Sequence, residues 1–203
     1  MPDLLVTAFD PFGWEPVNAS QRTLELLPDA IGPWTVHKLV LPTTFEGGTQ
    51  LLLETVQRLH PQAVLCLGQA TGRTALTPER VAINLDDARI PDNAGKQPLE
   101  QPIVPDGPAA YFSTLPVTAL AKAIKAAGLP AEVSLTAGSF VCNHVLYALL
   151  HHIAVEGLPI RAAFLHLPLL EEQARQLPQP LFGLPAEELA RGVEAAIGAI
   201  PVE

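Results

Sequence analysis

The chain contains little cysteine, little lysine and no long hydrophobic run. Two of its 203 residues are cysteines, and 12 basic residues face 21 acidic ones, which gives a formal net charge of −9. An acidic chain offers no basic surface for phosphate backbones or anionic lipids, so nucleic acids and membranes are excluded as expected partners. No apolar run approaches the ~20 residues of a membrane span, and the opening Met1-Pro2-Asp3-Leu4 lacks the basic and apolar parts of a signal peptide. The sequence therefore predicts a cytoplasmic protein.

Two cysteines are too few for a disulfide framework, but the chain does not need one. Apolar residues make up 48% of the sequence, enough for one sizeable core. The 21 prolines are dispersed through turns and form no linker that would divide the chain, so residues 1–203 are expected to form a single catalytic domain. Cys66 lies in the apolar run 63–67 and is interpreted as a buried core residue.

Short β-rich runs alternate with longer segments in which apolar residues recur at helical spacing. The predicted strands are 4–9, 35–41, 63–67, 132–136 and 161–167, and the predicted helices are 20–27, 45–59, 117–127, 143–155 and 186–200. This alternation, with strands that are nearly all apolar, is typical of a mostly parallel sheet buried on both sides. The predicted fold class is α/β: a single-domain open sandwich with a mostly parallel twisted sheet, helices on both faces and an accessory hairpin region.

The segment 77–111 departs from the alternation because it is long, polar in patches and rich in turn residues. Long irregular segments in compact α/β domains tend to be functional loops. Its opening, 79–85, is expected to contribute the strand of the accessory hairpin.

The most informative motif is 136–144, in which the turn at Gly138 delivers Cys142 to the first residues of a helix. The N-terminus of a helix carries partial positive charge and unpaired N–H groups, which favour thiolate over thiol and can stabilise an oxyanion. Cys142 is therefore a candidate nucleophile. Ser139 is a poor alternative, because it does not lie in the Gly-x-Ser-x-Gly turn of serine hydrolases.

A cysteine nucleophile needs a nearby base, and His166 is the candidate because it ends a predicted strand. Parallel strands end at one edge of the sheet, about 4.8 Å apart, so the predicted strands 132–136 and 161–167 would bring Cys142 and His166 together there. A third polar group usually orients such a histidine. Glu79 is the candidate for this role, and Asp86, Asp87 and Asp92 remain open as alternatives.

The other histidines are given structural interpretations. His144 lies two residues from Cys142 and therefore on a different helix face, which suggests packing or capping. His151 and His152 lack the spacing of a helical metal site, so no metal is predicted. The segment 68–72 lacks the spacing of nucleotide-binding loops, and no cofactor is predicted. The apolar residues near the expected catalytic edge, Phe9, Phe12, Phe140 and Val141, suggest a compact hydrophobic pocket, with core packing as the alternative.

Seven blocks of the chain resemble the pyroglutamyl peptidases I, cysteine peptidases that remove an N-terminal pyroglutamyl residue from peptides. The blocks cover most of the chain in the order of the family: 6–13, 68–70, 77–85, 88–93, 106–111, 136–144 and 164–168. The resemblance implies Cys142 as nucleophile, His166 as general base and later acid, and Glu79 as its orienting residue. It also implies a substrate site for pyroglutamyl peptides formed by Phe9, Phe12, Thr43, Gln69, Arg89, Ile90, Phe140 and Val141.

Within that site, the resemblance assigns Gln69 to polar contacts with the lactam ring and Arg89 to the oxyanion region. An ion pair of Arg89 with Asp86 or Asp87 is the alternative. The chain departs from the common pattern at Ser139, Thr71 and Leu135, which affects loop rigidity and leaving-group preference rather than the reaction. Related enzymes are often oligomeric, so a homo-oligomer, dimer or tetramer, is expected. A different cysteine amidase or acyl transferase, and a catalytically silent pyroglutamyl-peptide binding protein, are the alternative functions.

Overall fold

The computed structural model describes residues 1–13 and 15–202, in which strands and helices alternate along the chain. The elements are β1 (Asp3–Phe9), α1 (Ala19–Leu26), β2 (Ala30–Ile31), β3 (Trp34–Leu41), α2 (Phe45–Leu59), β4 (Ala63–Gln69), β5 (Thr77–Pro78), β6 (Val81–Ile83), β7 (Ala110–Phe112), α3 (Val117–Ala126), α4 (Val141–Glu156), β8 (Arg161–Leu167), β9 (Leu169–Leu170), α5 (Glu171–Gln176), β10 (Gly183–Leu184) and α6 (Ala186–Gly198).

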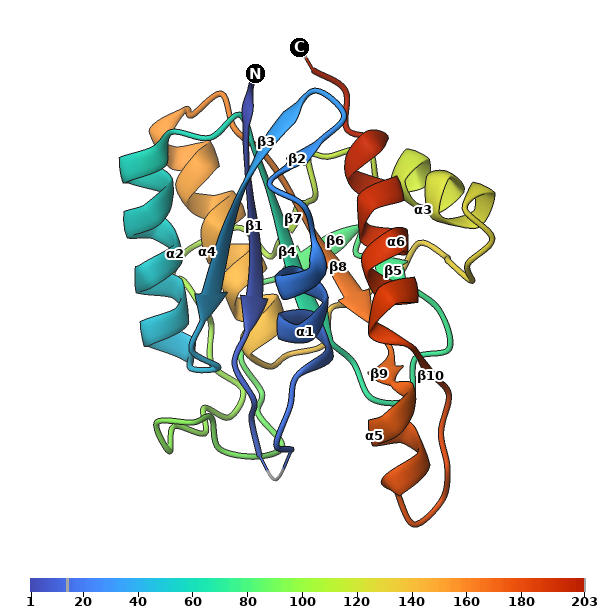
Figure 1. Ribbon diagram of the computed structural model, residues 1–203. Coiled ribbons are helices and arrows are strands. Elements are labelled where there is room, and N and C mark those ends of the chain that lie inside the picture. Colours follow the sequence, from blue (N-terminus) through green and yellow to red (C-terminus); the bar gives the residue numbers. More distant parts are fainter. Residues whose placement is uncertain (14, 203) are drawn as a thin grey trace.

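The main sheet has the strand order β2-β3-β1-β4-β8-β5. Strands β3, β1, β4 and β8 are parallel, and the short outer strands β2 and β5 run antiparallel to their neighbours. Helices α2 and α4 cover one face of the sheet, and α1, α3 and α6 cover the other (Figure 1). The predicted α/β sandwich with a mostly parallel sheet is confirmed.

Alternate residues of β4 and β8 face opposite layers, as the pleat of a strand requires. Leu65 and Leu165 pack in the cluster with α1, α3 and α6, whereas Cys66 and Phe164 pack in the cluster with α2 and α4. Cys66 is fully buried, as predicted, and this burial raises the pKa of its thiol to about 12. The strands therefore contribute to two separate hydrophobic layers.

Four of the five predicted helices differ from α1, α3, α4 and α6 by one or two residues at an end, and the prediction for α2 coincides with it. Helix α4 begins two residues earlier than predicted, at Val141, and stops where Gly157 adopts a positive φ of 62°. This φ suits glycine, which has no Cβ to clash. Along the described residues, no helix has the length and apolar character needed to span a membrane.

The predicted strand 132–136 is wrong. Ala131 and Ser134 form only isolated parallel bridges, to Leu76 and Glu79, and Leu135 is 74% exposed. The Ser134 hydroxyl donates to the carbonyl of Thr136 and accepts from its N–H, at 3.1 and 3.2 Å. These local bonds satisfy backbone groups that a continuous ladder would otherwise use. The position beside β8 is instead taken by the antiparallel β5.

The accessory hairpin is present, formed by β6 and β7 in antiparallel pairing. Its first strand is fastened to α4 by Asn143, whose side chain accepts from the N–H of Ile83 and donates to its carbonyl, both at 2.9 Å. Asn143 follows Cys142 directly, so the hairpin and the start of α4 form one unit at the carboxyl edge of the sheet.

Candidate active site

Cys142 lies in the first turn of α4, as its motif predicted. The chain reaches the helix through Gly138, which has a φ of 80°, and through the extended residue Phe140, whose side chain makes no capping hydrogen bond. The N–H groups of a first helical turn have no partner within the helix. Cys142 as a whole residue has an intermediate exposure, and it stands beside these N–H groups.

The thiol lies against β4 at Gly68. A Cβ atom at this position would be 3.1 Å from the Cys142 Sγ and 2.6 Å from the ring of Phe164. Gly68 is also directly opposite His166 in the β4–β8 register. The rings of Phe164 and His166 lie 4.6 Å apart, centroid to centroid, on the side of β8 that faces α4. The thiol and the imidazole therefore converge on the same position of the β4–β8 pair.

Glu79 forms a hydrogen bond with Nδ1 of the His166 imidazole. His166 Nδ1 lies 2.7 Å from Glu79 Oε1, and the Glu79 side chain is fully buried. The backbone N–H of Glu79 donates to the carbonyl of Phe164 at 2.8 Å, which fixes this residue against β8. An ionised carboxylate can only accept, so Nδ1 carries the hydrogen and Nε2 has the free lone pair. This is the tautomer that a general base requires.

The other acidic residues considered for this role have different partners. Asp86 Oδ2 lies 2.7 Å from Nδ1 of His144, whose ring also packs edge-on against Phe45. Asp92 accepts from the backbone N–H of Phe45 at 2.9 Å, and Asp87 is exposed. These contacts give His144 the structural position expected of it. Of these carboxylates, Glu79 is the one that accepts the hydrogen bond from His166.

The thiol of Cys142 is not acidic in this environment. Burial raises its pKa to about 12, assisted by electrostatic interactions with Glu79 and with Cys66, while a hydrogen bond from its own backbone N–H acts in the opposite direction. The expectation that the helix N-terminus would favour thiolate is therefore wrong for the free protein. Desolvation outweighs the helix dipole because it penalises the whole charge, whereas the dipole offers about half a charge.

Aromatic rings surround this edge of the sheet. Phe9 stacks on Phe164 at 6.3 Å, and Phe12 lies 6.2 Å from Phe140. Phe45, the first residue of α2, meets Phe140 edge-on at 5.4 Å. Of the predicted apolar residues, Phe12 thus packs against Phe140 in the segment that carries Cys142, and Phe9 packs against Phe164 of β8. Val141 is buried at the start of α4.

Phe45 was missed by the sequence interpretation. It lies two residues after Thr43, at the point where a predicted helix begins after a predicted strand. In a parallel sheet this is the same edge as the other site residues. Its position at this junction of strand and helix is the sequence signal that points to Phe45.

The remaining predicted site residues take more peripheral positions. Buried Thr43 donates its backbone N–H to Asp10 at 2.7 Å, beside Phe9. Gln69 accepts from the N–H of Ala19 at 2.8 Å, and its buried amide nitrogen has no partner within residues 1–13 and 15–202. Arg89 and Ile90 are exposed.

Arg89 and Ile90 belong to a segment that is fastened to the loop before Cys142. The N–H of Asp87 donates to the carbonyl of Ser139 at 3.0 Å, and the Ser139 hydroxyl donates to the carbonyl of Asp87 at 2.8 Å. Within the described residues, Arg89 forms no ion pair with Asp86 or Asp87. Its guanidinium is therefore not committed to the structural role considered as an alternative.

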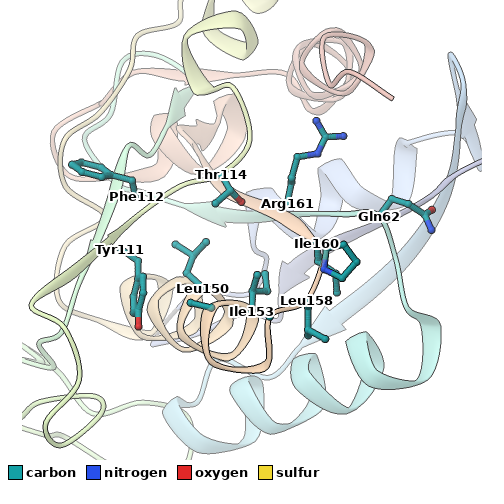
Figure 2. A pocket seen from close by; sticks show the side chains of 12 residues that line it. Gln62, Tyr111, Phe112, Thr114, Leu150, Ile153, Leu158, Ile160 and Arg161 are labelled. Atoms are coloured by element: carbon teal, nitrogen blue, oxygen red, sulfur yellow. The ribbon is translucent and has the colours of Figure 1, made fainter. Parts of the chain in front are cut away.

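A cleft of about 680 Å³ lies elsewhere, at the opposite end of β8 (Figure 2). It is bordered by Arg161, the first residue of β8, and by Leu150 and Ile153 from the second half of α4. Cys142 and His166 lie at the other ends of these elements. The cleft contributes nothing to the thiol and imidazole site.

Comparison with known proteins places the chain in one family. A family model described as pyroglutamyl peptidase matches residues 2–203. The chain belongs to the pyroglutamyl peptidase family. Among relatives, the pyrrolidone-carboxylate peptidase of Levilactobacillus brevis is 50% identical over 202 residues, covering 98% of this chain and 97% of its own. That of Streptococcus suis is 49% identical, covering 97% of this chain and 91% of its own.

Solved structures of pyroglutamyl peptidases share the fold. Pyroglutamyl peptidase I of Bacillus amyloliquefaciens superposes with a TM-score of 0.94 at 40% identity, covering 98% of this chain and 97% of its own. The pyrrolidone carboxyl peptidase of Thermococcus litoralis has a TM-score of 0.94 at 34% identity, with coverages of 98% and 93%. The family resemblance stated from the sequence motifs is confirmed.

Replacing Gly68 with alanine should damage the site by sterics alone. The added methyl would lie 2.6 Å from the Phe164 ring, so the ring or the strand must move, which costs about 1–3 kcal/mol in an overpacked core. We expect Cys142 to shift with it and kcat/KM to fall at least about tenfold. Gly198→Ala is the control, because a methyl there meets no atom within 4 Å. If both variants have the same activity in steady-state assays, Gly68 is not packed closely against Phe164 and Cys142.

Proposed function

We propose that this chain is a cysteine exopeptidase that hydrolyses the amide bond following an N-terminal pyroglutamyl residue. The observation that carries the proposal is the convergence of Cys142 and His166 at Gly68, with Glu79 behind the imidazole. Membership of the pyroglutamyl peptidase family supports the choice of substrate. A nucleophile, a base and an orienting carboxylate are the components that acyl transfer requires.

The reaction begins from a protonated thiol, because burial holds the pKa of Cys142 near 12. His166 Nε2 takes the thiol proton as sulfur attacks the pyroglutamyl carbonyl carbon, and Glu79 stabilises the imidazolium that forms. The same proton then passes to the departing amine, leaving a thioester on Cys142. A water molecule, deprotonated by His166, attacks the thioester and releases pyroglutamate. The thiol recovers its proton, and the enzyme is regenerated.

The oxyanion formed in each attack needs hydrogen-bond donors. The N–H groups in the first turn of α4 lie beside the thiol and point along the helix axis toward the reacting carbonyl. We assign the N–H of Cys142 to this role, and Arg89 as a second donor whose guanidinium is exposed and free of ion pairs in the described residues.

Specificity for the lactam follows from what the site offers. Pyroglutamate has its amine closed into a neutral ring, which suits an apolar wall with a few polar contacts. We assign that wall to Phe9, Phe12, Ile90, Phe140 and Val141, and the polar contacts to Thr43 and Gln69. A free N-terminus would bring an ammonium ion into the same apolar surroundings, and burying it without a partner is costly.

The test is release of a fluorescent amine from a pyroglutamyl amide and from the matching glutaminyl amide under reducing conditions. We expect cleavage of the pyroglutamyl substrate alone. Cleavage of both would indicate a broader cysteine amidase. Binding of the pyroglutamyl peptide by folded protein without any cleavage would indicate a binding protein instead.

We also propose that the enzyme is a homo-oligomer, a dimer or a tetramer. Large apolar side chains on its surface support this, since Leu135 is 74%, Phe112 71% and Leu99 61% exposed. Exposed apolar surface of this kind is commonly covered in oligomers. Size-exclusion chromatography with light scattering should give two or four times the 21.6 kDa chain mass. A monomer at all concentrations would contradict the proposal.

A further inference from the structure

Arg73 connects the acidic residue of the site to the loop that carries the thiol. It follows Gly72, whose φ of 88° makes the turn after β4. Its Nη2 lies 3.1 Å from Glu79 Oε1 and 2.9 Å from the carbonyl oxygen of Thr136. Thr136 begins the segment that leads through Gly138 to Cys142. One guanidinium nitrogen therefore bridges the two halves of the candidate active site.

The carboxylate of Glu79 is buried and has few hydrogen-bond partners. Its side chain has no exposure, and Oε1 accepts from both His166 and Arg73, while Oε2 has no partner in the described part of the chain. An ionised carboxylate buried with so few hydrogen bonds is costly unless a positive charge lies close to it. Arg73 supplies that charge, and its side chain, 27% exposed, remains in contact with water.

We propose that Arg73 is a positioning residue for the reaction: it pairs with the carboxylate of Glu79 behind His166 and fixes the loop before Cys142, so that imidazole and thiol stay aligned. The inference rests on the proposed function and deepens it. Arg73 touches neither of the reacting atoms in this scheme, and it acts through Glu79 and through the backbone of Thr136.

The charges around the site fix the sign of the expected effect. The titratable groups at Glu79 are Arg73 from the turn after β4, His166 from β8 and Cys142 from α4, with Cys66 of β4 next to Cys142. Without the guanidinium charge, a proton enters the Glu79–His166 pair more easily. The pair must be unprotonated to accept the thiol proton. Removal of Arg73 therefore extends the inactive, protonated state to higher pH.

The first test is Arg73→Gln, which removes the charge and keeps an amide donor. We expect kcat to fall about tenfold with KM within twofold, and the acid limb of the pH–rate profile to move up by about one pH unit. Arg73→Lys keeps the charge and should keep the acid limb of the wild type. The control is Arg80→Gln, because Arg80 donates to Thr118 on α3 at 2.8 Å instead. An unmoved acid limb in Arg73→Gln, or one displaced equally in the lysine variant, would overturn the proposal.

A second measurement does not depend on turnover. The negative charge of Glu79 already contributes to the raised pKa of Cys142, and Arg73 offsets that charge. In Arg73→Gln, alkylation of Cys142 by iodoacetamide at pH 8 should therefore be several-fold slower than in the wild type, while Arg80→Gln should match the wild type. If the wild type, Arg73→Gln and Arg80→Gln are alkylated at equal rates, Arg73 does not have the proposed role. Because the readout is a modified cysteine, it remains decisive even if the wild type cleaves no pyroglutamyl amide.

Discussion

Cys142→Ala should lower the turnover of a pyroglutamyl amide at least about a thousandfold and leave the fold intact. Without sulfur no thioester forms, and the residual rate comes only from binding and oxyanion stabilisation. Cys142 is partly exposed at the start of α4, so loss of one sulfur atom removes little packing. Thermal unfolding of the variant should stay within a few degrees of the wild type. Steady-state kinetics at saturating substrate measure the loss.

Cys66→Ala is the matched control, because it removes the other thiol of the chain. Cys66 is fully buried beside Phe164, so alanine there should cost about 1–2 kcal/mol of stability through a small cavity, with turnover within a few-fold of the wild type. The two variants thus separate chemistry from packing. A folded Cys142→Ala protein that retains turnover would show that another residue is the nucleophile.

Glu79→Gln should be nearly as damaging, with kcat about 10²–10⁴ lower, although the substitution changes almost no volume. A glutamine oxygen in the position of Oε1 can still accept from both His166 Nδ1 and Arg73, which leaves the amide NH₂ in the position of Oε2. The neutral amide no longer carries the negative charge that stabilises the imidazolium formed when His166 takes the thiol proton. The proton transfer that starts the reaction therefore becomes less favourable.

Glu132→Gln is the control for Glu79→Gln, since Glu132 is an exposed glutamate of the neighbouring segment. It should match the wild type in both kcat and KM. The decisive comparison is kcat, because substrate binding requires no imidazolium at His166. If Glu79→Gln loses affinity with unchanged kcat, Glu79 belongs to the substrate site and the orienting role is wrong.

The parts of the fold that sequence reasoning predicted are those with a strong pattern. Strands β1, β4 and β8 are mostly apolar because both faces of the sheet are covered, and α2 has its boundaries marked by Thr44 and by His60 at a positive φ of 49°. Local sequence pattern also predicted that Cys142 lies at the start of a helix and that His166 lies near the end of a strand. The rule that parallel strands end at one edge correctly placed His166 there, at the end of β8. The strand 132–136, from which the same rule placed Cys142, is absent.

The wrong predictions arise where contacts between residues distant in sequence determine the local structure. The run 132–136 has β-rich residues, but hydroxyl hydrogen bonds at Ser134 and the exposure of Leu135 leave no ladder there. The thiol of Cys142 was expected to be acidic because a sequence shows the helix start and not the depth of burial. Arg73 was missed for a related reason. Its partners, Glu79 and Thr136, lie 6 and 63 residues away and are joined only by the folded chain.

Labelling with a pyroglutamyl chloromethyl ketone, followed by digestion and mass mapping, identifies both the nucleophile and the lactam specificity in one experiment. We expect one label per chain on Cys142, none on buried Cys66, and loss of activity in step with labelling, while the glutaminyl analogue leaves the enzyme active and unlabelled. A stoichiometric label elsewhere, or full activity after Cys142 is labelled, would show that Cys142 is not the nucleophile.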